Sequence, residues 1–401
     1  MSNIDRNKAT KAGGEAAKPT RKKVDPERVQ VFVEEIFGPT QHARRVESLA
    51  NAVVGITEVA VLSIHAIGQA YAQVADRTGK SGVKQIDRLL SNDNVVLSAV
   101  LKTWVGFVIG ARRELVMAMD WTDFDADRQT TLAVYLITDH GRATPLCWKT
   151  YLKAAIKNNQ KRFEREMVEQ LHEWIDPQVR ITLLADRGFG DQNLYDYLLF
   201  LGWDFVIRFR GNIMVTAADG ERRTARQWVS ANGRSVLLRK AKVTADEYEI
   251  PAVVVTWDKR MKEPWCLATT LKELGASKIV KRYGRRFTIE ETFRDQKDGH
   301  FGMGLKATHI GKPERRDRLL LLAAMTQALL TMLGAAAERA GLDKYQKSNT
   351  VKRRQYSLFR QGLYWYGAIP AMREEWLVPL MTAFDAIVRE HTFFRDVYGV
   401  I

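Results

Sequence analysis

Cysteine is almost absent from this chain. Cys147 and Cys266 are the only two cysteines among 401 residues, and they lie far apart without forming a CxxC pair. The sequence therefore excludes a disulfide framework and a cysteine zinc site, and it is typical of a reducing compartment. No secretory signal is recognisable, because the first apolar run follows a long polar start. We therefore expect a cytoplasmic protein.

Long hydrophobic runs are equally scarce. The single stretch that resembles a membrane span covers residues 319–337, and Thr326, Gln327 and Thr331 interrupt its middle. A run of that length is barely enough to cross a bilayer, which takes about 20 residues. The sequence favours a buried core helix here, so we expect no membrane as a partner.

Acidic residues are outnumbered by basic ones. The chain has 47 Asp and Glu against 62 Lys and Arg, which gives a formal net charge of +15 and a pI near 9.7. A field of that sign attracts polyanions before any specific contact forms, so nucleic acid is the expected partner. Hydrophobic residues make up 46% of the chain, enough to bury a real core and to exclude a disordered basic tail.

Changes of pattern along the chain divide it into segments of different character. We expect a flexible basic arm (1–24), a helical DNA-binding domain (25–113), the first part of an α/β core (114–210), a β-rich insertion with its return strand (211–271), a helix that completes the core (272–300) and a C-terminal helical region for dimerisation and DNA contacts (301–401). Asp25 followed by Pro26 predicts the first helix start. Breaks between the first helices are expected at residues 38–39, 55 and 77–82.

The expected helical domain contains a candidate DNA-reading pair of helices. A helical pattern over residues 64–75 is followed by a glycine-bearing turn and by a second helix over residues 83–90. As a helix-turn-helix, this pair would present Lys84, Gln85 and Arg88 to a groove of DNA. Any helical hairpin offers the same pattern, so both interpretations stay open.

From Glu114 onward the apolar pattern is that of a mixed α/β sheet. Three successive β segments predict an antiparallel meander, and helix and strand then alternate. Two of the strands end in an acid, because Asp120 closes the run LVMAM and Asp186 closes ITLLA. A carboxylate at the carboxyl end of a buried strand points into the crevice where open α/β sheets bind ligands. We therefore expect both acids at a functional site.

A helix predicted over residues 283–297 carries an unusual polar face. Its residues Tyr283, Arg286, Glu290 and Lys297 stand at offsets of three, seven and fourteen. At about 100° and 1.5 Å per residue they share one face over about 21 Å, enough to follow several phosphates of a nucleic-acid strand. A solvated helix with an ion pair between Arg286 and Glu290 is the simpler interpretation, and the helix alone does not decide between the two.

Three acids can meet if this helix packs near the two strand ends. Crowded carboxylates repel one another, and hard divalent cations relieve that repulsion, so Asp120, Asp186 and Glu290 predict a site for Mg²⁺ or Mn²⁺. Two such ions about 3.5–4 Å apart support in-line displacement at phosphorus by water or by a DNA 3′-hydroxyl. Each strand acid also has a simpler interpretation as a turn residue, and the acids within residues 123–127 compete with Asp120. Asp191 is expected to cap the next helix.

The signature positions carry a resemblance to a known family. The spacing of Tyr283, Arg286, Glu290 and Lys297 resembles the YREK signature of DDE transposases from bacterial insertion sequences, in the insertion-sequence-four family that includes the transposon-five and transposon-ten enzymes. The segments AMDWT and LLADRGFGD stand upstream in the family's order. The resemblance implies an RNase H-like catalytic core with a β-rich insertion, flanked by an N-terminal helical DNA-binding domain and by C-terminal helices.

The resemblance also implies which residues act in catalysis. Asp120, Asp186 and Glu290 would be the catalytic acids and would hold two ions of Mg²⁺ or Mn²⁺. One departure from the pattern is Gly284 inside the signature helix, which costs about 1 kcal/mol relative to alanine and predicts a local kink.

A second group of residues would contact DNA by the same resemblance. Tyr283, Arg286 and Lys297 would bind phosphates near the transposon end. Arg294 is a weaker phosphate candidate from its position alone, about 40° from Glu290 on the same helix face. Trp265 resembles the family's tryptophan that stacks on a flipped base near the cut. Its simpler interpretation is a tryptophan packed beneath the insertion.

Together these observations predict a DNA transposase that performs cut-and-paste transposition by metal-dependent hydrolysis and strand transfer, through a hairpin intermediate. Two DNA ends must be cut in concert, so we expect a homodimer on double-stranded transposon-end and target DNA, in the bacterial cytoplasm. One alternative is an RNase H-like nuclease that cuts without joining. Another is a DNA-binding regulator derived from a transposase, which replacement of an acid by Ala or Asn would favour, but all three acids are present.

Overall fold

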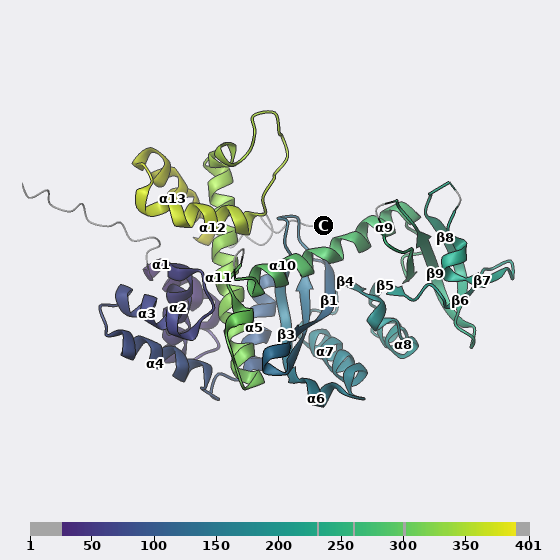
Figure 1. Ribbon diagram of the computed structural model, residues 1–401, viewed down its shortest axis with the longest axis horizontal. Helices are drawn as coiled ribbons and strands as arrows, with labels where there is room; N and C mark the ends of the chain where they lie inside the picture. The colour runs from purple at the N-terminus through teal and green to yellow at the C-terminus, as the bar shows by residue number, and fades with distance from the viewer. Residues whose placement is uncertain (1–25, 231, 260, 300–301, 390–401) are drawn as a thin grey trace, which may run out of the picture.

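The computed structural model describes residues 26–230, 232–259, 261–299 and 302–389. The basic arm expected over residues 1–24 lies outside the described residues. Helices from both ends of the sequence pack together at one end of a long mixed sheet, and the inserted strands form the opposite end (Figure 1). The catalytic candidates belong to the middle of this arrangement.

Helices form the N-terminal part, as its sequence pattern predicts. They are α1 (Pro26–Phe37), α2 (Ala43–Val59), α3 (Ile64–Val74), α4 (Gly79–Leu90) and α5 (Leu97–Ile109). The predicted break at Gly55 is wrong, because α2 runs straight through this residue. A Cβ atom on Gly55 would lie 2.5 Å from the carbonyl oxygen of Ile67, so glycine allows α2 and α3 to approach closely rather than ending a helix. The break predicted over residues 77–82 is shorter, since α4 begins at Gly79.

One mixed sheet contains all the strands that the structure describes. They are β1 (Glu114–Phe124), β2 (Gln129–Leu136), β3 (Thr144–Leu152), β4 (Arg180–Ala185), β5 (Asp204–Phe209), β6 (Met214–Thr216), β7 (Arg222–Thr224), β8 (Val236–Val243), β9 (Tyr248–Thr256) and β10 (Trp265–Thr269). Their order in the sheet is β3-β2-β1-β4-β5-β10-β9-β8-β6-β7. The first three strands form the predicted antiparallel meander, and β4 and β5 follow parallel to β1. Because β10 lies between β5 and β9, the insertion extends the central sheet.

Different helices cover the two faces of this sheet. One set is α6 (Lys153–Ile156), α7 (Gln160–Trp174) and α8 (Gln192–Phe200), and the other is α9 (Ala276–Gly284) and α10 (Thr288–Lys297). Two consecutive residues of β1 point to opposite faces of the sheet and contact different helices. Asp120 pairs with Arg286, just before α10, whereas the indole N–H of Trp121 donates to Glu164 of α7 at 3.0 Å. In Figure 1, α9 and α10 lie nearly in line along the sheet, on the side away from α7.

The helix predicted over residues 283–297 is interrupted in the structure. A turn of 3₁₀ helix, Arg285–Phe287, separates α9 from α10 and begins immediately after Gly284. The backbone stays in the right-handed helical region through Gly284 and Thr288, so the chain keeps its course. The tighter 3₁₀ winding changes which side chains share a face, and this is the irregularity that the glycine predicts.

Three helices complete the described C-terminal part: α11 (Pro313–Arg339), α12 (Leu358–Ala368) and α13 (Glu374–Arg389). By length and composition α11 could cross a membrane, as could α2 and α3 if their bent pair were one span, but the most apolar 18-residue window of α11 is entirely buried inside the protein. The sequence pattern of the C-terminal helical region does not single out α12, because its aromatic and basic sequence resembles a connecting segment. A Cβ atom on Gly334 would lie 1.9 Å from the carbonyl oxygen of Leu358, so glycine brings α11 and α12 into backbone contact.

Candidate active site

Two neighbouring strands bring two acids to the same face of the sheet. The last pair of the parallel ladder between β1 and β4 is Met119 with Ala185. The next residues are Asp120 and Asp186, on strands about 4.8 Å apart, and strand alternation turns both side chains toward α9 and α10. The predicted strand end at Asp120 is wrong, because β1 continues to Phe124 in its pairing with β2. Asp120 thus lies just beyond the last residue of β1 that pairs with β4.

Arg286 joins the acid of the strand to the acid of the helix. One guanidinium nitrogen donates to Asp120 Oδ2 at 3.0 Å, and the other terminal nitrogen donates to Glu290 Oε1 at 2.8 Å. The backbone N–H of Trp121 donates to Asp120 Oδ1 at 2.9 Å. The Arg286 side chain is buried, whereas 51% of the Glu290 side chain is exposed. The guanidinium fork therefore fixes Asp120 firmly and leaves Glu290 open to solvent on one side.

Asp186 follows β4 directly, as predicted. Its Oδ1 accepts a hydrogen bond of 2.8 Å from the N–H of Gly188, so it also stabilises the turn after the strand. Its interpretation as a turn residue is therefore correct, and its place beside Asp120 adds to that role. Asp191 caps α8 by accepting from the N–H of Asn193 at 2.9 Å, as predicted.

The acids that compete with Asp120 have partners elsewhere. Lys153 pairs with Asp123 at 3.0 Å and with Asp125 at 2.6 Å, at the exposed end of β1. Asp127 pairs with Arg316 and accepts from the backbone N–H of Ile310 at 3.2 Å. These three acids are neutralised at the far end of the strand. Asp120 is therefore the acid of β1 whose carboxyl interacts electrostatically with Asp186 and Glu290.

Burial disfavours the charged form of the Asp120 carboxyl, and the two neighbouring acids add to this effect. Its pKa is raised to about 6, chiefly because the carboxyl is buried, and the nearby charges of Asp186 and Glu290 raise it further. The Arg286 guanidinium and the Trp121 N–H oppose this rise without cancelling it. A cation placed beside this buried carboxyl would favour its ionised form. The cluster therefore favours an added cation.

The donor chemistry of this cluster fits a hard divalent ion. Its oxygens are those of carboxylates, which Mg²⁺ and Mn²⁺ prefer. Within the part of the chain that the structure describes, no three Asp, Glu, His or Cys side chains are grouped tightly enough to hold one ion. Arg286 bridges Asp120 and Glu290 instead. The single charge of this guanidinium partly neutralises the two carboxylates that it joins.

A family comparison agrees with this geometry. The model of the family described as "Transposase DDE domain" matches residues 112–329, more than half of the 401 residues. The chain belongs to this family of DDE transposases. A comparison with curated proteins found no match. The DDE domain match begins just before β1 and ends within α11, so it contains the three acids, the insertion and the signature helix.

In this DDE domain, the aromatic residues near the acids pack against one another. The Tyr283 side chain is fully buried, and the Trp265 ring meets it edge-on at a centroid distance of 5.0 Å. The ring of Phe287, 37% exposed, stacks on Trp265 at 5.6 Å. Trp265 therefore packs against the signature helix, and not beneath the insertion as its simpler interpretation expects. It is only partly buried and stays at the edge of the site.

Lys297 and Arg294, both candidates for DNA contacts, have different surroundings. The Lys297 ammonium donates to Thr122 Oγ1 at 2.9 Å and to the carbonyl oxygen of Asp123 at 2.6 Å, which ties α10 to β1. Burial lowers the pKa of Lys297. Arg294 is exposed and pairs with Glu291 one turn earlier. The predicted polar face of the helix thus turns toward the sheet along much of its length.

Helix α4 presents the two basic residues predicted for groove contact. Lys84 and Arg88 are exposed on it, four residues apart on one face. The hydroxyl of Thr78 accepts from the N–H of Ser81 and caps the helix, after a short turn from α3. A Cβ atom on Gly82 would lie 2.1 Å from the carbonyl oxygen of Gly68, so the two helices touch at glycine. The two helices form a compact pair joined by a short turn.

Several charged residues lie just beyond the acids, and no sequence motif predicts them. Arg187 pairs with Glu263 at 3.0 Å, and Arg208 pairs with the same carboxylate at 2.8 Å. Arg210 follows two residues later and is exposed. Two arginines that alternate at the end of an apolar strand are the only sequence signal for this group, and such alternation is common in half-exposed strands.

Proposed function

We propose that this DDE transposase performs cut-and-paste transposition in the manner of the insertion-sequence-four family with the YREK signature. The observation that carries the proposal is the bridge from Arg286 to Asp120 and Glu290, beside Asp186 on the neighbouring strand. It joins the arginine and the glutamate of the signature to the first of the strand acids. An RNase H-like core, with Asp120, Asp186 and Glu290 as its catalytic residues, accounts for this convergence.

The proposed chemistry is hydrolysis followed by transesterification. Asp120, Asp186 and Glu290 would hold two Mg²⁺ or Mn²⁺ ions, which lower the pKa of the attacking hydroxyl and stabilise the leaving oxygen. Water frees a 3′-hydroxyl at each end of the element. That hydroxyl attacks the opposite strand to form a hairpin, which is reopened before the ends are joined to target DNA.

Residues of the signature helix would position the phosphate. Arg286 Nε and the Tyr283 hydroxyl are buried, and neither makes a hydrogen bond of normal geometry to a described residue. Leaving such donors without a partner costs free energy. A phosphate oxygen that enters beside Asp120 would supply one. Lys297 and Arg294 would then contact phosphates further along the strand, and Trp265 would receive a base turned out of the duplex.

The helical parts would recognise DNA and pair two copies of the chain. Lys84 and Arg88 on α4 would face a groove of the transposon end, as their exposure and the capped helix pair allow. Two ends must be cut together, so the active species would be a homodimer on DNA. Its contact would involve α12 and α13, on which Tyr364 and Val378 are 58% and 62% exposed.

Glu290→Gln tests the proposed role of the helix acid. The change keeps the size of the side chain and its hydrogen bond from Arg286 but removes its charge, so cleavage of transposon-end DNA in Mg²⁺ should fall at least about 1,000-fold. Binding of the same DNA in a gel-shift assay should stay within about twofold. Glu291→Gln, one residue away and paired with Arg294, is the matched control and should keep its cleavage. Equal loss of binding and cleavage in Glu290→Gln would assign Glu290 to the fold.

The route of the reaction has a separate test. The protein is incubated with Mg²⁺ and with the DNA that flanks its own gene, and the products are separated on a denaturing gel. Hairpin-ended fragments, which rejoin after heating and run at twice the single-strand length, support the proposed route. Nicked or blunt products without joining would favour a nuclease that cuts without strand transfer.

A further inference from the structure

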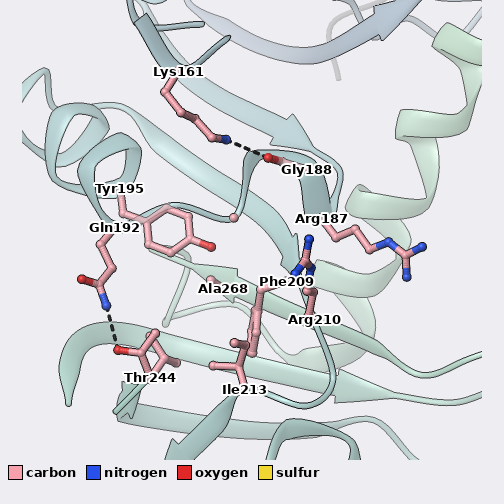
Figure 2. A pocket seen from close by; sticks show the side chains of 12 residues that line it. Lys161, Arg187, Gly188, Gln192, Tyr195, Phe209, Arg210, Ile213, Thr244 and Ala268 are labelled. Atoms are coloured by element: carbon pink, nitrogen blue, oxygen red, sulfur yellow. Dashed lines mark hydrogen bonds between the residues drawn. The ribbon is translucent and has the colours of Figure 1, made fainter. Parts of the chain in front are cut away.

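A cavity of about 350 Å³ lies on the opposite face of the sheet from the three acids. It forms under the loop that follows Asp186, between α8 and the first strands of the insertion, and Figure 2 shows the side chains around it. Gly190 packs closely here, because a Cβ atom at this position would lie 3.3 Å from the backbone oxygen of Arg208. The loop that carries a catalytic acid on one face therefore closes a cavity on the other.

The floor of this cavity is aromatic and apolar. Tyr195, Phe209 and Ile213 contribute to it, and the Tyr195 ring is held rigidly by stacking on Phe205, with a centroid distance of 5.1 Å and an interplanar angle of 9°. The Tyr195 hydroxyl points toward the middle of the cavity (Figure 2). A flat ring with polar edges fits such a floor better than a branched aliphatic group does.

One wall of the cavity is polar and held in place. The Gln192 amide donates to the hydroxyl of Thr244 at 2.7 Å, which links the start of α8 to the end of β8 (Figure 2). The carbonyl oxygen of Gln192 and the hydroxyl of Thr244 keep capacity for further hydrogen bonds. This wall can therefore read the edge of a ring that carries both donors and acceptors.

The mouth of the cavity is cationic. Arg187 and Arg210 line it and also line a second hollow of about 510 Å³, to which Arg226 contributes, whereas Lys161, across the cavity, is paired with Glu164 at 3.1 Å. Glu263 is the acid of this second hollow and is paired with Arg187 and Arg208. Arg210 and Arg226 are both exposed, so their charges remain available to an anion.

We propose that this cavity binds a nucleoside phosphate unit, with the base on the floor formed by Tyr195, Phe209 and Ile213 and the phosphate at Arg187 and Arg210. The inference rests on the proposed function, because the source we favour is a nucleotide of the DNA strand that passes the acids. The size of the cavity is at the lower end of the range of about 300–1,000 Å³ for ligand sites, which suits one nucleotide unit. Trp265 lies on the other face of the sheet, so this is a second and separate place for a base.

Cross-linking to DNA tests the site directly. A duplex with the transposon end and its flank carries one photoreactive 4-thiothymidine at a time near the cut, and the cross-linked peptide is identified by mass spectrometry. One or two positions should cross-link to residues 190–195 or 209–213. Cross-links to Trp265 alone, or to no cavity residue at any position, would overturn the proposal. Mg²⁺-dependent cleavage of the same duplex is measured in parallel, so that failure of the cavity and failure of the proposed reaction are told apart.

Paired variants separate the cavity from general DNA binding. Gln192→Trp fills the cavity, and Asn193→Trp, on the next and exposed position of α8, is its control. Arg210→Glu reverses the charge at the mouth, and Arg222→Glu does so at an exposed arginine of β7 away from it. The cavity variants should lower the yield of the cavity cross-link about tenfold or more, as expected for a lost contact to a charged group, and the controls less than twofold. Equal losses in variants and controls would contradict the proposal, and circular dichroism confirms that all four are folded.

Free thymidine monophosphate distinguishes the two sources of the ligand. In saturation-transfer NMR with wild-type protein, saturable binding that Gln192→Trp removes would support the cavity with a free nucleotide as its ligand. A cavity cross-link without binding of the free nucleotide would support a nucleotide held within DNA. If the experiments detect no cavity cross-link and no saturable binding, the assignment is overturned.

Discussion

Two consecutive helices of this transposase are both packed against the sheet, yet they are held there by different forces. In α11 the residues from Arg316 to Ala337 are all buried, and most of them are Leu, Ala or Met. The turn and helix from Arg285 to Lys297 have few apolar residues and are fixed to β1 by ion pairs and hydrogen bonds. Helix α11 therefore supports the fold, whereas the signature helix orients charges at the site.

The largest effect on stability should come from an apolar residue of α11. Leu322→Ala removes a fully buried side chain and leaves a cavity, so the free energy of unfolding should fall by about 2–5 kcal/mol. Chemical denaturation measures this change, and activity per folded molecule should remain. Leu199→Ala, at a position that is 42% exposed, should cost far less. Similar costs for the two variants would mean that burial in α11 is not what holds this helix.

Arg286→Ala should lower stability less than Leu322→Ala does, but it should reduce cleavage of transposon-end DNA more. Asp120 would then lose the cation that lowers its pKa, and repulsion by its neighbours would increase. We expect a loss of about 1–3 kcal/mol at pH 8, because a charge removed from a buried pair leaves its partner uncompensated. At pH 5 the loss should be smaller, since Asp120, with its raised pKa, then binds a proton. Arg285→Ala, which breaks the more exposed pair with Asp139, is the control.

The contrast between the helices is least clear at the start of α11, where a charged residue is buried. Asp317 accepts hydrogen bonds from the N–H and the hydroxyl of Thr150, at 3.2 and 2.5 Å, and burial raises its pKa to about 7. Between about pH 4 and pH 7 the unfolded chain has lost this proton while the folded chain keeps it, so stability falls as the pH rises. Above about pH 7 the stability that this proton contributes is lost completely.

Asp317→Asn should therefore flatten this part of the stability profile. At pH 8 the variant should gain about 1 kcal/mol relative to wild type, because the removed charge outweighs one weakened hydrogen bond. Urea denaturation across pH 4.5 to 8 measures the effect. A profile parallel to that of the wild type would show that another group controls it.

The smallest effect on stability is expected at the exposed side of the signature helix. Arg294→Ala breaks only a solvent-exposed pair with Glu291, so the melting temperature should not change measurably. If Arg294 contacts a DNA phosphate as proposed, binding of transposon-end DNA should weaken, and the salt dependence of the binding constant should decrease by about one unit of slope. Unchanged DNA binding would remove Arg294 from the contact surface.

Much of the fold was predictable because its signals are local. The meander from Glu114, the strand before Asp186 and the core helix over residues 319–337 each have a strong apolar pattern, and the structure confirms them. Where tertiary contacts override local propensity, the prediction failed. Gly55 continues α2 and lets the backbone of Ile67 approach closely, and Gly334 and Gly362 let the segment with α12 pack as a helix on α11.

The sequence by itself determined which residues could share a site. Period and spacing select Asp120, Asp186 and Glu290 among 47 acids, since apolar runs end at the first two and the signature register selects the third. Only the tertiary structure decided how these charges are balanced. The parallel register of β1 and β4 places the two aspartates side by side, and the packing of α10 turns Arg286 inward to bridge Asp120 and Glu290. Coulombic energy depends on distance and on burial, and both are properties of the folded chain rather than of the order of its residues.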